Sequence, residues 1–91
     1  RRPDRDGGGA LKVRVRLFAA LREIVGQEEV ELELAPGTTV SGLWEKLVSR
    51  NERLAPYAKS INFAVNHDFV SRERELAAND EVAFLPPVSG G

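Results

Sequence analysis

The chain has 91 residues, enough for one domain with a modest core, and a formal net charge of −1. A nearly neutral chain lacks the basic surface that binds nucleic acid or anionic membranes, so neither is expected as a partner. Cysteine is absent, which excludes disulfides, thiolate metal sites and cysteine nucleophiles. No apolar run approaches the roughly 18 residues of a membrane span and no signal peptide is visible, so we expect a cytoplasmic protein.

The N-terminal segment 1–9 is charged and glycine-rich, and we expect it to be disordered because it carries too little apolar surface to pack. A nucleic-acid-binding arm is the alternative, but Asp4 and Asp6 dilute its positive charge. The first strand is predicted at 11–18, where apolar and polar residues alternate. A short helix is predicted next, at 19–25, because a glycine suited to a helix end follows it.

A second strand is predicted at 28–34, where glutamates alternate with apolar residues. Its glutamates could face the basic side chains of the first strand. Such opposite-charge pairs are each worth about 0.2–1 kcal/mol and would favour pairing of the two strands. The charged residues are Lys12, Arg14 and Arg16 on one strand and Glu29, Glu31 and Glu33 on the other.

The longest helix is predicted to start at Thr38 or Thr39, after the Pro36-Gly37 turn, and to reach about Asn51. Apolar residues recur along it at the spacing of one helical stripe. The stripe consists of Val40, Leu43, Trp44, Leu47 and Val48. Trp44 lies within it, so we interpret this residue as part of the core.

The C-terminal part is predicted to complete a sheet. A connection at 51–59 is followed by predicted strands at 60–66, 69–70 and 81–85, with turns at 66–68 and 77–80. This order predicts an α+β domain over residues 10–85, in which a mixed sheet wraps around one long amphipathic helix as in a β-grasp roll. Residues 86–91 are expected to form a flexible tail.

The residues of a conventional catalytic site are missing. His67 is the only histidine and falls in a predicted turn, so neither a serine–histidine–aspartate triad nor a multi-histidine metal site can be built around it. Gly7-Gly8-Gly9 lacks the spacing and the lysine of a phosphate-binding loop. We therefore expect no metal, no bound cofactor and no catalytic machinery in the chain itself.

The C-terminal run Pro86-Pro87-Val88-Ser89-Gly90-Gly91 directly follows the last predicted strand. The prolines favour an extended exit, and the two glycines can enter a channel too narrow for a Cβ atom. The reactive group at the tip is the carboxylate of Gly91, which a partner must activate, for example as an acyl-adenylate, before it can accept sulfur or join an amine. A frayed terminus is the alternative interpretation of a bare Gly-Gly.

An apolar patch is predicted on the outer face of the sheet. By strand parity Phe18, Ala64, Phe69 and Leu85 point there, although a face that met only water should be polar. Leu85 lies just before the tail, where docking of a partner would need an apolar surface. Arg16 borders the patch and could meet an acidic rim. Alternatively, the two phenylalanines pack under a loop.

Three stretches resemble the ubiquitin-like sulfur carriers that form the small subunit of molybdopterin synthase, also called molybdopterin-converting factor subunit 1. The stretches are LFAALRE at 17–23, AVN at 64–66 and DEVAFLPPVSGG at 80–91. The resemblance covers about residues 12–91. The last stretch is the most specific, because ubiquitin and the thiamine sulfur carrier share the fold and Gly-Gly but are not expected to show the Pro-Pro-Val-Ser spacer.

The resemblance implies a ubiquitin-like β-grasp fold and a role in molybdenum cofactor biosynthesis. An E1-like adenylyltransferase would use ATP to adenylate Gly91, and a desulfurase or rhodanese-type protein would supply the sulfur of a thiocarboxylate. Within the large synthase subunit, in a heterotetramer with sulfurtransferase activity, this sulfur would pass to cyclic pyranopterin monophosphate, with Gly90 giving clearance. The implied partner-binding residues are Arg16, Phe18, Phe69, Leu85, Pro86, Pro87, Val88 and Ser89.

Other functions stay open at this point. A ubiquitin-like protein modifier, joined to lysines through isopeptide bonds, would share the fold and the tail chemistry, although the Pro-Pro-Val-Ser run favours the carrier. A sulfur carrier for thiamine synthesis or tRNA thiolation is also compatible. The third possibility is an interaction domain with an inert tail.

Overall fold

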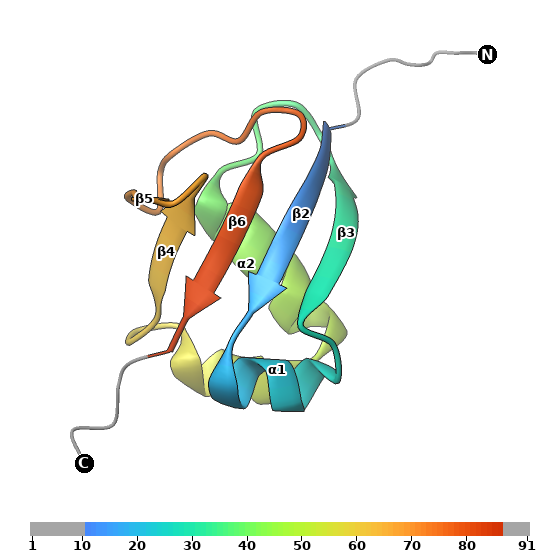
Figure 1. Ribbon diagram of the computed structural model, residues 1–91, viewed down its shortest axis with the longest axis vertical. Coiled ribbons are helices and arrows are strands. Elements are labelled where there is room, and N and C mark those ends of the chain that lie inside the picture. The colour runs from blue at the N-terminus through green and yellow to red at the C-terminus, as the bar shows by residue number, and fades with distance from the viewer. Residues whose placement is uncertain (1–10, 87–91) are drawn as a thin grey trace.

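The computed structural model describes residues 11–86, so the predictions made for 1–9 and 87–91 fall outside the described part of the chain. Its elements are β2 (Leu11–Leu17), α1 (Ala19–Val25), β3 (Glu29–Leu34), α2 (Val40–Arg50), the 3-10 helix η1 (Glu52–Tyr57), β4 (Asn62–Val65), β5 (Asp68–Phe69) and β6 (Glu81–Leu85). Within this region the strands form one five-stranded sheet in the order β3-β2-β6-β4-β5. The β2–β6 pair is parallel and the other pairs are antiparallel, which confirms the predicted mixed sheet (Figure 1).

The predicted pairing of the first two strands is confirmed in register. Lys12 lies opposite Glu33, Arg14 opposite Glu31 and Arg16 opposite Glu29. The ion pairs that Arg14 and Arg16 form within residues 11–86 are nevertheless with Glu81, each at 3.5 Å. Because β6 runs parallel to β2 on the side away from β3, the first residue of β6 places one carboxylate between both arginines.

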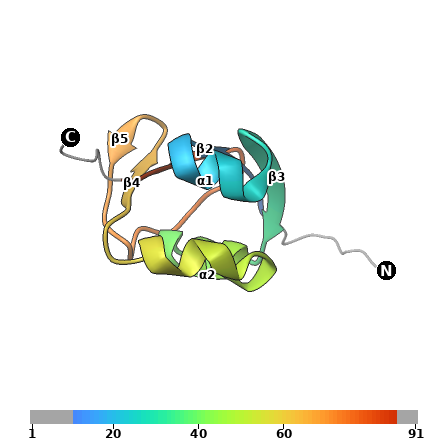
Figure 2. The ribbon, with the colours of Figure 1, turned by 90° about the horizontal axis from the view of Figure 1, so that it is seen from below.

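Helix α2 crosses one face of the sheet and encloses the core (Figures 1 and 2). Thr39 caps it, since its hydroxyl oxygen accepts a hydrogen bond of 3.1 Å from the backbone N–H of Gly42. The predicted stripe faces the sheet: Val40, Leu43, Trp44 and Leu47 are buried. The Trp44 ring lies 5.2 Å from the ring of Phe84 on β6, which confirms Trp44 as a core residue.

Two segments without a predicted element complete the core. The stretch 51–59, interpreted as a connection, forms η1, which fully buries Leu54. The stretch 71–76 covers the start of α2, where the backbone N–H groups of Val40 and Ser41 donate to carbonyls of this segment at 2.9 and 3.0 Å. The first-turn N–H groups of a helix have no partner within it, so this segment satisfies groups that a sequence pattern does not reveal. Its Leu76 is buried as well.

Candidate partner-docking site

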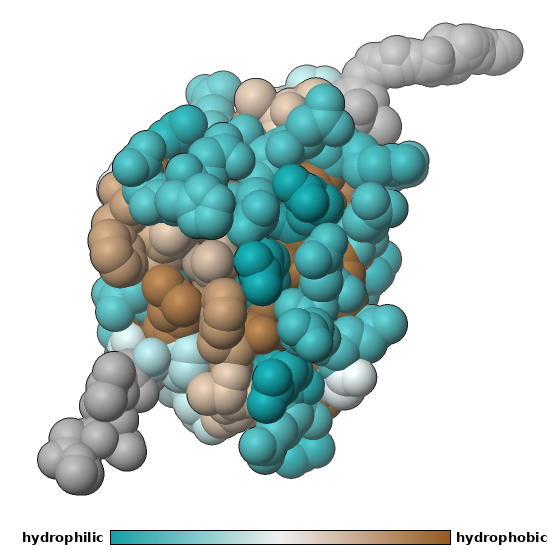
Figure 3. Space-filling model, in the orientation of Figure 1, coloured by the Kyte–Doolittle hydropathy of each residue, from teal (hydrophilic) through white to brown (hydrophobic). Residues whose placement is uncertain are grey.

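An apolar depression lies on the face of the sheet opposite α2. Figure 3 shows brown side chains gathered over β4 and β6 within a largely teal surface. The depression has a volume of about 230 Å³. Its lining residues are Arg16, Phe18, Ala64, His67, Phe69, Glu81, Ala83 and Leu85. All four residues of the predicted patch are therefore brought together, with Arg16 at their border.

The floor of the depression is made of small side chains. Ala64 on β4 and Ala83 on β6 lie directly opposite each other in the antiparallel ladder. Ala64 is only 6% exposed although it is on the outer face, because Phe69 is its partner in the next strand. The larger side chains around these alanines leave a hollow of the kind that receives an apolar anchor from a partner.

Phe18 lies at the rim because the backbone changes direction directly after β2. The strand was predicted to include Phe18, but it ends at Leu17, and Phe18 is instead the extended residue that precedes α1 (φ −126°, ψ 152°). Ala19 follows with a φ of 51°, a left-handed conformation that is uncommon for a residue other than glycine. This reversal starts the helix at once and leaves the ring of Phe18 beside the sheet, so the phenylalanine does not pack under a loop.

A tight hairpin presents Phe69. Val65 pairs with Asp68, so Asn66 and His67 alone form the turn, and their φ values of 51° and 75° are those of a type I′ turn. The strand predicted at 69–70 therefore begins one residue earlier, because the turn needs two residues and not three. Phe69 is 73% exposed, the degree of exposure expected of a group that contacts a partner.

Sequence reasoning missed three residues of the lining. His67 was predicted only to lie in a turn; it is exposed in that turn, but it also lines the depression. Glu81 and Ala83 have the same outward parity on β6 as Leu85, so the alternation of that strand carried the signal. Pro86 is described and half-buried, whereas Pro87, Val88, Ser89, Gly90 and Gly91 lie outside the described residues.

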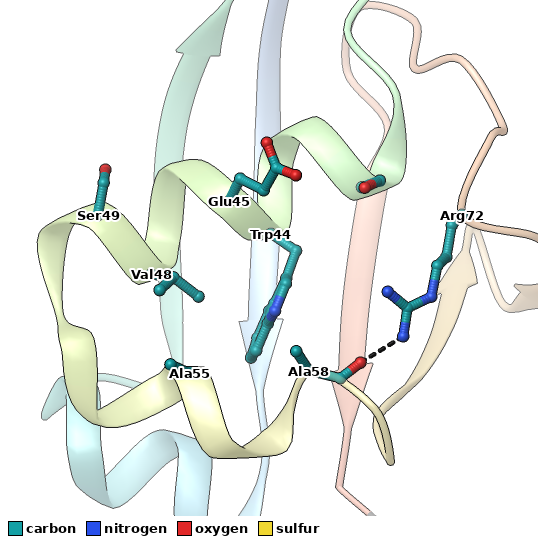
Figure 4. A pocket seen from close by; sticks show the side chains of 8 residues that line it. Trp44, Glu45, Val48, Ser49, Ala55, Ala58 and Arg72 are labelled. Atoms are coloured by element: carbon teal, nitrogen blue, oxygen red, sulfur yellow. Dashed lines mark hydrogen bonds between the residues drawn. The ribbon is translucent and has the colours of Figure 1, made fainter.

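A second depression, of about 350 Å³, lies between α2 and η1 (Figure 4). Two of its polar groups are engaged or covered. The Arg72 guanidinium donates to the carbonyl oxygen of Ala58 and lies 5.4 Å from the Phe63 ring. The indole N–H of Trp44 has no acceptor among the described residues, but surrounding atoms cover it. This depression lies on the α2 side of the sheet, away from the predicted apolar patch and from Leu85, so the depression beside Leu85 is the better candidate site.

Other features of the described residues bear on the class of protein. Within residues 11–86 no three histidine, cysteine or acidic side chains are grouped so as to hold a metal ion. No helix in the same region is long and apolar enough to span a bilayer. The parallel β2–β6 pair at the centre of a mixed sheet, packed on α2, defines a ubiquitin-like β-grasp domain.

Comparison with known proteins shows to which family of β-grasp domains the chain belongs. The family model described as the ThiS family matches residues 15–91, and the chain belongs to this family. The chain is 38% identical over 81 residues to the molybdopterin synthase sulfur carrier subunit of Escherichia coli (strain K12), a match that covers 87% of this chain and 99% of that protein. The resemblance predicted from the three sequence stretches is thereby confirmed.

Solved structures are similar over most of the chain. A putative molybdopterin converting factor, subunit 1, from Pyrococcus furiosus has a TM-score of 0.77 and 36% identity, covering 86% of this chain and 99% of that one. The small archaeal modifier protein 1 from Methanosarcina acetivorans has a TM-score of 0.76 and 31% identity, covering 92% and 100%. The β-grasp fold is thus shared by relatives named for two different functions.

Proposed function

We propose that the chain is the sulfur carrier subunit of a molybdopterin synthase and that it works in the cytoplasm by presenting Gly91 as a thiocarboxylate. The observation that carries this proposal is that the depression runs along β6 as far as the last residue of the strand. Leu85 lines the depression and is also the last residue of that strand. Because β6 pairs with β2 on one side and β4 on the other, the position of its last residue, Leu85, is fixed relative to the depression.

The proposed chemistry begins at the C-terminal carboxylate. A carboxylate oxygen of Gly91 attacks the α-phosphorus of ATP on an E1-like adenylyltransferase and displaces pyrophosphate. The terminal sulfur of a persulfide on a desulfurase or rhodanese-type protein then attacks the acyl carbon and displaces AMP. A thiol of the donor protein reduces the resulting acyl disulfide, which releases the thiocarboxylate and leaves a disulfide on the donor. In the large subunit this sulfur passes to cyclic pyranopterin monophosphate, while Gly90 allows close passage because it has no Cβ atom.

The proposed docking surface serves the large subunit and the activating enzyme in turn. Phe18, Phe69 and Leu85 supply apolar contact area around a floor of alanines, and Arg16 supplies a charged border. The large subunit would contribute the acids, bases and phosphate-binding groups of the reaction. Two carriers on a dimeric large subunit would form the heterotetramer, and the same face cannot contact both partners at once.

Mass spectrometry of the intact chain tests this proposal. The chain is incubated with ATP, the activating enzyme and a sulfur donor, and the product is then mixed with the large subunit and cyclic pyranopterin monophosphate. We expect an oxygen-for-sulfur exchange at Gly91, followed by return of the carboxylate as molybdopterin forms. An unchanged mass would contradict the proposal, as would a thiocarboxylate that the large subunit cannot use.

A protein modifier is the second candidate function, favoured by the similarity to small archaeal modifier protein 1 from Methanosarcina acetivorans. In this case the activated Gly91 would form isopeptide bonds with lysines, and lysine adducts would appear in the same experiment without any sulfur donor. A sulfur carrier of thiamine synthesis or tRNA thiolation would instead form the thiocarboxylate but fail to produce molybdopterin.

A further inference from the structure

The side chain of Asn66 links the β4–β5 turn to the start of β6. Its Nδ2 donates to Oδ1 of Asp80 at 3.0 Å, and its Oδ1 accepts from the backbone N–H of Glu81 at 3.1 Å. Its backbone N–H also donates to the carbonyl of Glu81 at 2.8 Å. One turn residue therefore makes three hydrogen bonds to two consecutive residues that are far away in sequence.

Asp80 is the second member of this network and is only 7% exposed. Its Oδ2 accepts from the backbone N–H of Ala77 at 2.7 Å, while its Oδ1 accepts from Asn66. Its backbone carbonyl accepts from the N–H of Arg14 on β2 at 2.9 Å. Charge-assisted hydrogen bonds of this kind are strong, and a buried carboxylate needs them to offset its lost hydration.

The network fixes a type I′ turn, which requires positive φ at both of its central residues. Asn66 and His67 both have positive φ, a conformation that is uncommon outside glycine although asparagine and histidine adopt it more often than most residues. Strand β5 consists of only two residues at the edge of the sheet, and its Phe69 is largely exposed. In the described part of the chain, besides the turn, only this short ladder and the hydrogen bond from the backbone N–H of Val70 to the carbonyl of Phe63, at 3.2 Å, fix the segment that carries both side chains.

We propose that Asn66 and Asp80 are positioning residues of the docking surface, which hold His67 and Phe69 at the rim of the depression beside β6. This inference rests on the proposed docking function, since it explains how the rim is fixed before a partner arrives. A preorganised rim avoids the entropy cost of ordering an exposed aromatic side chain on binding. Neither residue need touch the partner itself.

A polarity swap tests the network. In Asn66→Asp alone, the new carboxylate faces the carboxylate of Asp80. In Asp80→Asn alone, the new amide has one oxygen for two donors, the side chain of Asn66 and the backbone N–H of Ala77, so its own N–H group must face one of them. The double variant, which combines both changes, is complementary again, since the new amide at position 80 can donate to the new carboxylate at position 66 and still accept from Ala77. We expect each single change to weaken binding of the large subunit about fivefold to tenfold, and the double variant to recover to within about twofold.

Two further variants separate positioning from general stability. Val30→Ala removes a half-buried side chain from β3, at the other edge of the sheet, and should lower stability without changing affinity. Asn66→Gly keeps the positive φ accessible but deletes the side-chain hydrogen bonds, so it should fold and still bind more weakly. The proposal would be overturned if Asn66→Gly and both single variants bound the large subunit with wild-type affinity. It would also be overturned if the double variant bound no more tightly than the weaker of the two single variants.

Amide resonances of His67 and Phe69 provide a readout that needs no partner. We expect them to shift and broaden in the single variants and to return toward their original positions in the double variant. Unchanged resonances in the single variants would contradict the positioning role. If the wild-type chain does not bind the large subunit, the proposed docking function is wrong. The resonances of His67 and Phe69 still show, in that case, whether Asn66 and Asp80 fix the conformation of the turn.

Discussion

The guanidinium carbon of Arg16 lies 5.6 Å from the centre of the Phe18 ring, on the rim of the apolar depression. The same guanidinium is 3.5 Å from the carboxylate of Glu81, so Arg16 links the end of β2 to the first residue of β6. The sequence left open that this arginine meets an acidic rim of a partner, but a carboxylate of its own chain already contacts it. A partner group would therefore share Arg16 with Glu81.

Replacing Arg16 with glutamine should weaken docking more than folding. The pair with Glu81 is partly exposed, so its loss should change the free energy of unfolding by less than about 1 kcal/mol. Phe18 would lose the cation above its ring, and we expect affinity for the large subunit to fall about threefold to tenfold by calorimetry. Arg14→Gln is the matched control, because Arg14 pairs with the same Glu81 but does not line the depression. Equal losses in both variants would contradict a specific role for Arg16.

Truncation of the apolar rim should be costly for binding. Phe18→Ala, Phe69→Ala and Leu85→Ala are each expected to weaken partner binding by about 1–3 kcal/mol, the scale of anchor truncations. Phe69→Ala should leave the thermal midpoint nearly unchanged, because the side chain is mostly exposed. Calorimetry with the large subunit measures the effect, and unchanged affinity in all three variants would show that the docking face lies elsewhere.

Filling the depression should block docking by a different route. Ala83→Leu places a large side chain on the floor without removing any rim residue. Since Ala83 is half-buried on the outer face, we expect the domain to remain folded while affinity for the large subunit falls at least tenfold, about 1.4 kcal/mol or more. Ala55→Leu, which places the same bulk in the depression between α2 and η1, is the control. A partner that tolerates Ala83→Leu does not insert a side chain here.

Substitutions in the core should lower the stability of the domain, unlike the substitutions on its docking surface. Trp44→Ala removes a ring that is 3% exposed and packs on Phe84, so we expect a loss of about 3–5 kcal/mol in the free energy of unfolding. Trp44→Phe should cost less, because it keeps the aromatic contact and removes an indole N–H that has no acceptor among the described residues. Denaturant unfolding measures both changes. Equal losses in the two variants would show that the aromatic contact with Phe84 contributes little to stability.

Deletion of Gly91 should abolish sulfur transfer while leaving the domain intact. The residue follows the folded body by several positions, so thermal unfolding should be unchanged. Thiocarboxylate formation requires the terminal acyl group at the right distance from the docking face, and mass spectrometry should therefore detect none. Molybdopterin formation at the full rate by the shortened chain, or by one extended beyond Gly91, would refute the proposed role of the terminus.

Much of the domain could be predicted from local patterns. The alternation in β2, β3 and β6, the Thr39 cap and the apolar stripe of α2 each report burial on one side of a local element. The outward parity of Leu85 and Phe69 was sufficient to predict the patch, because strand geometry fixes which side chains share a face. Leu54 and Leu76 could not be placed in the same way, since each lies in a segment without a helical or strand period.

The sequence by itself determined the long helix, the main strands, the family and the apolar character of one sheet face, because periodicity and short motifs are properties of neighbouring residues. Only the tertiary structure decided that β6 pairs in parallel with β2, that Glu81 lies between Arg14 and Arg16, and that Asn66 bonds to Asp80. The glutamates of β3 and Glu81 look alike in sequence. Which of them meets an arginine depends on contacts between distant segments, and those form only when the whole sheet is assembled.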